Sequence, residues 1–139
     1  MGLLENKIAI ITGAGRGIGK ATAHQYSQEG ATVIIAEFDE QSGQETANSI
    51  GGHFFKADIR SQKSVNSLFE YVKKRFNRLN ILVNNAGILN DSTLKKMEPD
   101  KFDSVMNVNL RGTYLCGKAA ANIMIEQKSG VILNAASVV

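Results

Sequence analysis

Apolar residues are distributed along this chain in two patterns. Short runs rich in isoleucine and valine are separated by longer stretches in which apolar residues recur at helical spacing. The short runs are typical of strands buried on both faces of a sheet, and the longer stretches are typical of helices that cover such a sheet. The runs predict strands at residues 7–12, 31–36, 53–57, 81–84 and 130–136. The other pattern predicts a helix that ends at Gly30 and further helices at residues 40–50, 61–77 and 99–127.

The order of these elements predicts the fold. Residues 61–77 have the clearest amphipathic pattern, with one apolar face formed by Val65, Leu68, Phe69, Val72 and Phe76. Strands that alternate with helices indicate an α/β fold, a parallel sheet with helices on both faces. Right-handed crossovers then favour the strand order 3-2-1-4-5 of a doubly wound, Rossmann-type sheet. At 139 residues, with 43% hydrophobic residues, the chain is long enough for one such domain, residues 1–139.

The first strand leads into a glycine-rich turn, TGAGRGIG at residues 12–19, which opens the first helix. Gly13 allows a sharp turn off the strand, Gly17 leaves room for a pyrophosphate, and Gly19 allows close packing of the helix on the sheet. Free N–H groups at the start of the helix would face the phosphates. The turn therefore predicts a dinucleotide site. Its predicted cofactor-binding residues are Gly13, Arg16, Gly17, Ile18 and Gly19.

An acid at the end of the second strand bears on which coenzyme is bound. Glu37 follows Gly19 by eighteen residues, close to the separation at which an acid meets the adenosine ribose. Its carboxylate favours NAD, because it would repel the 2′-phosphate of NADP. Arg16 favours NADP, since a guanidinium in the turn could pair with that phosphate. We predict NAD as the cofactor, with NADP as the alternative.

Polar residues also end the other strands. Asp58 follows the third strand and suits the exocyclic amine of adenine, with Ile59 packing on the ring. Asn85, Ala86 and Gly87 follow the fourth strand and bring backbone close to the cofactor. Because ligands bind beyond the carboxyl ends of such strands, these residues together outline a nucleotide groove. For Asn84, a hydrogen bond to a neighbouring strand is an equally good interpretation. Ser137 ends the fifth strand.

The long helix carries an amide among apolar residues. Asn109 falls on the face traced by Phe102, Val105, Met106, Thr113, Cys116, Ala120 and Met124. Burying an amide is costly unless it is hydrogen-bonded. We favour a functional role, and the alternative is a bond to an adjacent loop or to the helix backbone. Gly112 follows three residues later, so we expect a local distortion of the helix there.

Composition excludes several other classes. The net charge of +3 is mild, and the cluster of Lys73, Lys74, Arg75 and Arg78 has no interleaved aromatics, which argues against nucleic-acid binding. The single cysteine excludes an internal disulfide and suits a cytoplasmic location. No apolar run is long enough to cross a membrane. The two histidines, His24 and His53, lack metal-ligand spacing, so we predict no metal site.

Five segments occur in one order along the chain: TGAGRGIG, ADI, NNAG, VNLRG and VILNAAS. In this order and spacing the chain resembles the short-chain dehydrogenase/reductase family. NNAGILNDSTLKKM and MNVNLRGTYLCGKAA look most like 3-oxoacyl-acyl-carrier-protein reductases. The resemblance implies hydride transfer between a nicotinamide and a small carbonyl or secondary alcohol, with acyl carrier protein as a possible carrier, and a homodimer or homotetramer. It implies Ser137 as the catalytic serine and Asn109 as the support of a proton-relay water.

The family's catalytic tyrosine and the lysine four residues on would follow the serine, beyond Val139. Tyr114 and Lys118 have the same spacing but precede Ser137, and we interpret them as neighbours on a helix surface. The fifth run has the composition of an interior strand, yet no strand follows it. We therefore expect these residues to be the N-terminal part of a longer oxidoreductase, inactive alone. The alternatives are a nucleotide-binding module without turnover and, less well supported, a methyltransferase.

Overall fold

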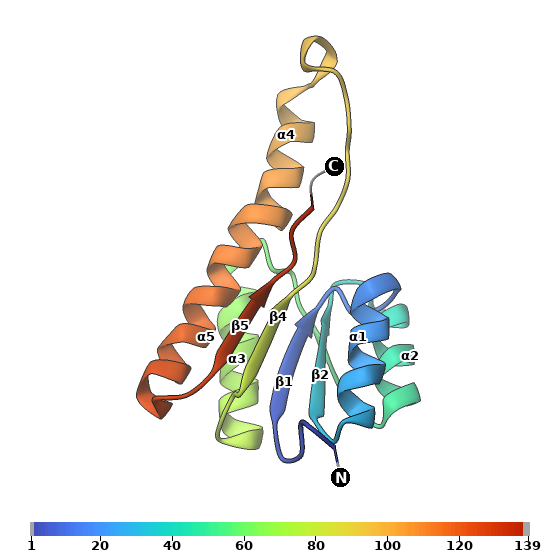
Figure 1. Cartoon of the computed structure of the whole chain (residues 1–139). Helices are drawn as coiled ribbons and strands as arrows, with labels where there is room; N and C mark the ends of the chain where they lie inside the picture. The colour runs from blue at the N-terminus through green and yellow to red at the C-terminus, as the bar shows by residue number, and fades with distance from the viewer. Residues whose placement is uncertain (1, 138–139) are drawn as a thin grey trace.

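A five-stranded parallel sheet forms the centre of the structure, a computed structural model that describes residues 2–137 (Figure 1). Its strands are β1 (Ile8–Thr12), β2 (Thr32–Glu37), β3 (His53–Lys56), β4 (Ile81–Asn84) and β5 (Val131–Asn134). The order across the sheet is β3-β2-β1-β4-β5, and every neighbouring pair is parallel. The predicted doubly wound topology is therefore confirmed, with strand ends within three residues of those expected.

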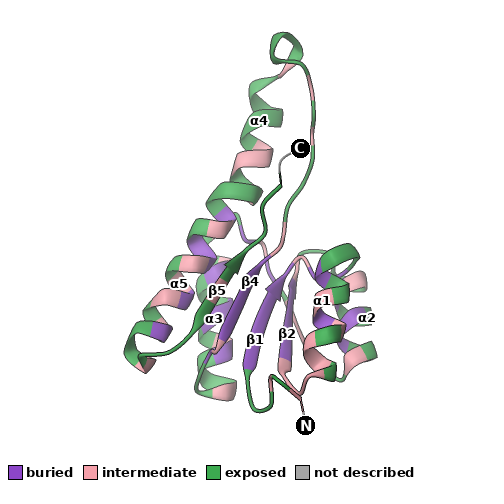
Figure 2. Ribbon diagram, in the orientation of Figure 1, coloured by how far each residue is buried: buried purple, intermediate pink, exposed green. Residues whose placement is uncertain are grey.

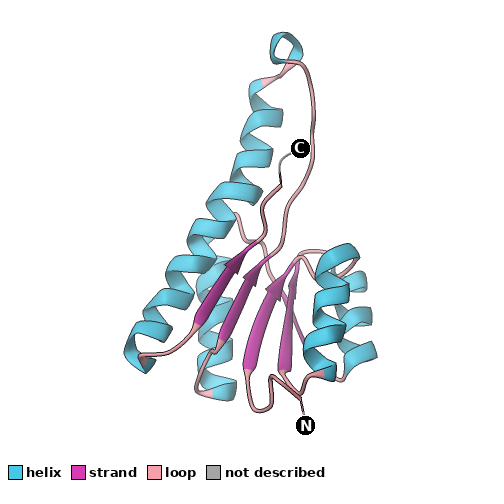
Figure 3. Cartoon of the chain, in the orientation of Figure 1, coloured by secondary structure: helices cyan, strands magenta, loops and turns pink. Residues whose placement is uncertain are grey.

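Helices cover both faces of the sheet (Figures 1 and 3). They are α1 (Gly17–Gln28), α2 (Glu40–Ile50), α3 (Gln62–Phe76), α4 (Pro99–Met106) and α5 (Thr113–Gln127), with a short 3-10 turn at Leu94–Lys96. Local sequence sets several boundaries. Asp39 and Ser61 cap the N-termini of α2 and α3 through their side chains, and Gly51 and Asn77 end these helices in the left-handed conformation.

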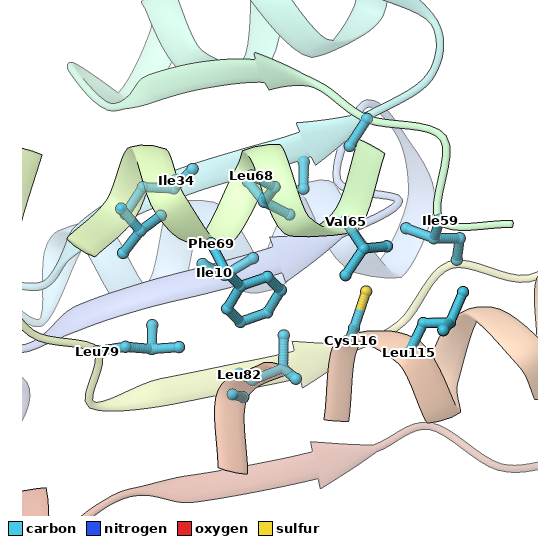
Figure 4. Packing of buried hydrophobic residues seen from close by; sticks show 14 of the residues in the cluster. Ile10, Ile34, Ile59, Val65, Leu68, Phe69, Leu79, Leu82, Leu115 and Cys116 are labelled. Atoms are coloured by element: carbon cyan, nitrogen blue, oxygen red, sulfur yellow. The ribbon is translucent and has the colours of Figure 1, made fainter. Parts of the chain in front are cut away.

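Alternate strand residues enter two separate cores. Ile10, Ile34 and Leu82 pack against α3 and α5, whose buried residues include Phe69 and Cys116 (Figure 4). The odd-numbered positions of β1 and β2 instead face α1 and α2. A parallel sheet buried on both faces requires apolar residues at consecutive positions, which explains the unbroken run in β1. The predicted core positions of residues 61–77 are buried apart from Phe76, which is partly buried.

The β5 side of the sheet is less well covered. Val131 and Leu133 are 51% and 46% exposed, whereas their register partners Ile81 and Val83 on β4 are buried (Figure 2). Within residues 2–137, β5 pairs only with β4. This strand therefore presents apolar side chains and one edge outside the two cores.

The long helix expected at residues 99–127 is not uniform. A π-helical segment, Asn107–Gly112, joins α4 to α5, which confirms the distortion expected near Gly112. The predicted apolar face is buried only along α5, whereas Phe102 is 54% exposed and Asn109 is exposed. That part of the prediction is wrong, because α4 projects beyond the end of the sheet formed by the described residues (Figure 1). None of the helices formed by the described residues is both long and apolar enough to cross a membrane.

Candidate nucleotide-binding site

The carboxyl ends of β1 to β4 open into a cleft of about 520 Å³. The fold brings nine of the predicted cofactor residues to its walls: Gly13, Arg16, Ile18, Glu37, Asp58, Ile59, Asn85, Ala86 and Gly87. Topology explains this grouping, since parallel strands end at the same edge of the sheet and each loop starts there. Their contact with a cofactor stays a prediction. Two others, Gly17 and Gly19, lie in the same turn but do not line the cleft.

Three of the four glycines of the turn meet different constraints. Gly13 has a φ of 65°, and a Cβ there would lie 2.7 Å from Cα of Ala86. Gly17 has a φ of 59° and faces open space, as a phosphate-binding position would. Gly19 is buried, and a Cβ there would lie 2.5 Å from the carbonyl oxygen of Gly13. The turn thus combines left-handed backbone at two positions with tight packing at the third.

A buried threonine joins the glycine turn to the loop after β4. The hydroxyl of Thr12 accepts hydrogen bonds from the backbone N–H groups of Asn85 at 3.1 Å and Ala86 at 3.0 Å. In return, the Asn85 amide donates to the carbonyls of Thr12 and Gly13 at 3.2 and 3.3 Å. These bonds fix one wall of the cleft. This role of Thr12 was not predicted from the sequence. A hydroxyl at the end of a buried strand could have indicated it, because a buried hydroxyl requires a hydrogen-bond partner.

Glu37 lies at the end of β2 and is partly buried. Burial raises the pKa of its carboxyl, while a hydrogen bond from the Phe38 backbone and the charge of Arg16 oppose that shift. Asp39 lies nearby on the same wall, but its side chain accepts a hydrogen bond from the backbone N–H of Ser42 at 3.1 Å and caps α2. Of these two acidic residues, Glu37 is therefore the one whose side chain does not cap a helix.

Asp58 is already paired in the structure. Nε and Nη2 of Arg60 donate to its two carboxylate oxygens at 2.9 and 3.0 Å. These hydrogen bonds lower the pKa of Asp58 and raise the pKa of Arg60. The guanidinium also lies 5.9 Å from the ring centroid of Phe38, which is 60% exposed. Arg60 and Phe38 line the cleft and were not anticipated, because no spacing rule links them to the glycine turn.

Asn84, which is buried, and Asn109, which is exposed, both have defined hydrogen-bond partners. Asn84 donates from its amide to Oδ1 of Asn134 on β5 at 3.0 Å, which confirms the interpretation of a bond to the neighbouring strand. Asn109 accepts from the backbone N–H of Ile88 at 2.9 Å and donates to the Ile88 carbonyl at 3.0 Å. This is the adjacent-loop bond given as the alternative for Asn109. Its catalytic role stays a prediction, and Ile88 itself lines the cleft.

The remaining candidate groups are not among the residues that line the cleft. Ser137 is exposed, in the segment that follows β5. Tyr114 is 53% exposed on α5, with Nζ of Lys118 6.0 Å from its ring centroid, an ordinary one-turn contact on a helix surface. Within the described part of the chain, no three histidine, cysteine or acidic side chains are grouped as metal ligands.

Comparison with known proteins places the chain in a family. A family model for short chain dehydrogenases matches residues 7–139. A 3-oxoacyl-[acyl-carrier-protein] reductase from Thermotoga maritima is 37% identical over an alignment of 141 positions, which covers 98% of this chain and 57% of that protein. A (2S)-[(R)-hydroxy(phenyl)methyl]succinyl-CoA dehydrogenase subunit from Thauera aromatica is 37% identical, over 96% of this chain and 56% of that protein.

The fold comparison agrees with the sequence comparison. A crystal structure titled ribose-5-phosphate isomerase, from Brucella melitensis, matches with a TM-score of 0.94 and 36% identity, over 97% of this chain and 53% of that chain. The chain thus spans little more than half the length of these relatives. The family model, the relatives and the strand order together show that this chain belongs to the short-chain dehydrogenase family.

Proposed function

We propose that the protein carrying these residues is an NAD(P)-dependent oxidoreductase that interconverts a carbonyl and a secondary alcohol. The observation that carries the proposal is the meeting of four strand ends in one cleft. The glycine turn, Glu37, Asp58 and the loop at residues 85–87 come from separate parts of the chain and line the same space. That combination fits a dinucleotide better than a single phosphate or a metal.

The residues of the cleft would divide the coenzyme between them. The N–H groups at the start of α1 would bind the diphosphate, next to the open face of Gly17. Glu37 would accept hydrogen bonds from the adenosine ribose, and Asp58 and Ile59 would meet the adenine. The partly buried carboxylate of Glu37 supports NAD over NADP, whereas Arg16 supports the opposite choice.

Ser137 and Asn109 would serve the chemical step. Nicotinamide, when bound, gives or takes the hydride. Ser137 would hydrogen-bond the substrate oxygen, and Asn109 would support a proton-relay water from the π-helical segment. The two hydrogen bonds between Asn109 and the backbone of Ile88 would hold the amide in place beside the cleft wall.

For the substrate we propose an oxo- or hydroxyacyl group on a carrier. The name of the Thermotoga relative specifies acyl carrier protein, and that of the Thauera relative specifies a coenzyme A ester. Oxidation of NADH in the presence of acetoacetyl-coenzyme A or acetoacetyl-acyl carrier protein would test this choice. Turnover of a free ketone, with neither thioester accepted, would argue against a carried substrate.

Coenzyme binding tests the central proposal. Purified protein is titrated with NADH and with NADPH, following nicotinamide fluorescence, and with ADP-ribose as a competitor. We expect saturable binding, tighter for NADH, and a shift toward NADPH in Glu37→Ala. If neither coenzyme binds, the proposal is wrong, and a reaction without nicotinamide, such as the isomerisation in the name of the Brucella relative, gains support. Binding without turnover of any carbonyl would favour the nucleotide-binding module.

A further inference from the structure

Two glycines lie on either side of the Glu37 side chain, and backbone conformation does not explain why these positions are glycine. Gly15 belongs to the glycine turn, and Gly43 belongs to the first turns of α2. Neither has the positive φ that favours glycine, unlike Gly13 and Gly17. The absence of a side chain at residues 15 and 43 must therefore be explained by what lies next to them.

The neighbours of these two positions include opposite ends of the Glu37 side chain. A Cβ at residue 15 would lie 2.7 Å from Oε1 of Glu37 and 3.0 Å from Cβ of Ser42, and would also collide with the Ser42 hydroxyl. A Cβ at residue 43 would lie 3.0 Å from Cβ of Glu37 and would enter the ring of Phe54. Contacts below 3.0 Å require a shift of one partner, so the carboxylate fills the space that Gly15 leaves.

A buried hydroxyl holds the two walls of this space together. Thr46 on α2 is fully buried, and its Oγ1 donates to the carbonyl oxygen of Gly15 at 3.3 Å. The glycine turn and α2 are thereby tied on either side of the carboxylate. This close packing also accounts for the direction of the Glu37 pKa, which burial raises.

We infer that Gly15 determines coenzyme selectivity by leaving room for the Glu37 carboxylate at the edge of the cleft. The inference rests on the proposed function. With a methyl group at residue 15, the carboxylate leaves its present position, so that it no longer meets the ribose hydroxyls or repels a 2′-phosphate. Gly15 itself need not touch the coenzyme. Its effect passes entirely through Glu37, which makes the two residues energetically coupled.

A double-mutant cycle tests the coupling. The dissociation constants of NADH and NADPH are measured for the wild type, Gly15→Ala, Glu37→Ala and the double variant. We expect Glu37→Ala to lower the preference for NADH by about tenfold or more, and Gly15→Ala to lower it by at least about threefold. In the Glu37→Ala background, Gly15→Ala should change the preference by less than about twofold.

A second background separates the contact with Glu37 from the contact with Ser42. Ser42→Gly removes the other side chain that a Cβ at residue 15 would meet, and it serves alone as the matched control. In this background Gly15→Ala should fold, as judged by circular dichroism, and should still lower the NADH preference. An unchanged preference there, or an equal change with and without Glu37, overturns the inference. In that case a clear effect of Glu37→Ala leaves the proposed function intact, whereas a wild type that binds neither coenzyme overturns both.

Discussion

Replacing Thr12 with valine should destabilise the protein by weakening the link between the glycine turn and the loop after β4. Valine keeps the volume of the buried side chain but lacks the hydroxyl that accepts hydrogen bonds from the N–H groups of Asn85 and Ala86. An unsatisfied buried donor costs about 1–3 kcal/mol. Both residues are only partly buried, so water will reach them in part, and we expect a total loss near the low end, about 2–3 kcal/mol.

Urea denaturation followed by circular dichroism measures this loss. With a urea slope of about 1–3 kcal/mol per M, the midpoint should fall by roughly 1–2 M. Thr12→Ser is the matched control, because it keeps the acceptor and loses only a methyl group, for which we expect about 1 kcal/mol. Coenzyme affinity should fall in the valine variant and persist in the serine variant. A surface substitution changes the free energy of unfolding by about 0.5 kcal/mol or less. If Thr12→Val changes it by no more than this, the hydrogen-bonding role assigned to the hydroxyl is wrong.

Three further predictions concern residues outside the cleft. Burial raises the pKa of the Cys116 thiol to about 12, so thiol reagents should label it only after unfolding. Because the unfolded thiol loses its proton near pH 9.0, stability should also fall as the pH rises from there toward about 12, and rapid labelling of folded protein would contradict this. Gln127→Ala should cost about 1–3 kcal/mol in urea unfolding, since the amide bonds both the N–H and the carbonyl of buried Leu79. Tyr114→Phe should leave coenzyme binding and any turnover unchanged, and a tenfold fall in turnover would reinstate Tyr114 as a catalytic candidate.

The residues that line the cleft differ in how far their position could be predicted from local sequence. The glycine turn, Glu37, Asp58 and residues 85–87 could be assigned to one rim because each directly follows a predicted strand, and parallel strands end together. Arg60 and Phe38 could not, since their contact depends on the side-chain directions of two different loops. The space between Gly15, Gly43 and Glu37 was hidden for the same reason.

The long helix shows the limit of periodicity most clearly. Its spacing placed Asn109 on an apolar face, yet periodicity cannot tell where the sheet beneath that face ends. The structure leaves Asn109 exposed and bonded to Ile88, beyond the layer that α5 covers. Burial is a property of two packed layers, and the sequence of one helix describes only its own side.

Sequence alone determined the five strands, their order and many of the residues that reach the rim, because these depend on local periodicity and on the handedness of crossovers. Tertiary structure alone decided which polar atoms meet. Thr12 and Asn85 are 73 positions apart, and their bond depends on how β1 and β4 are aligned. That alignment results from packing the whole sheet between its helices, which no local pattern encodes.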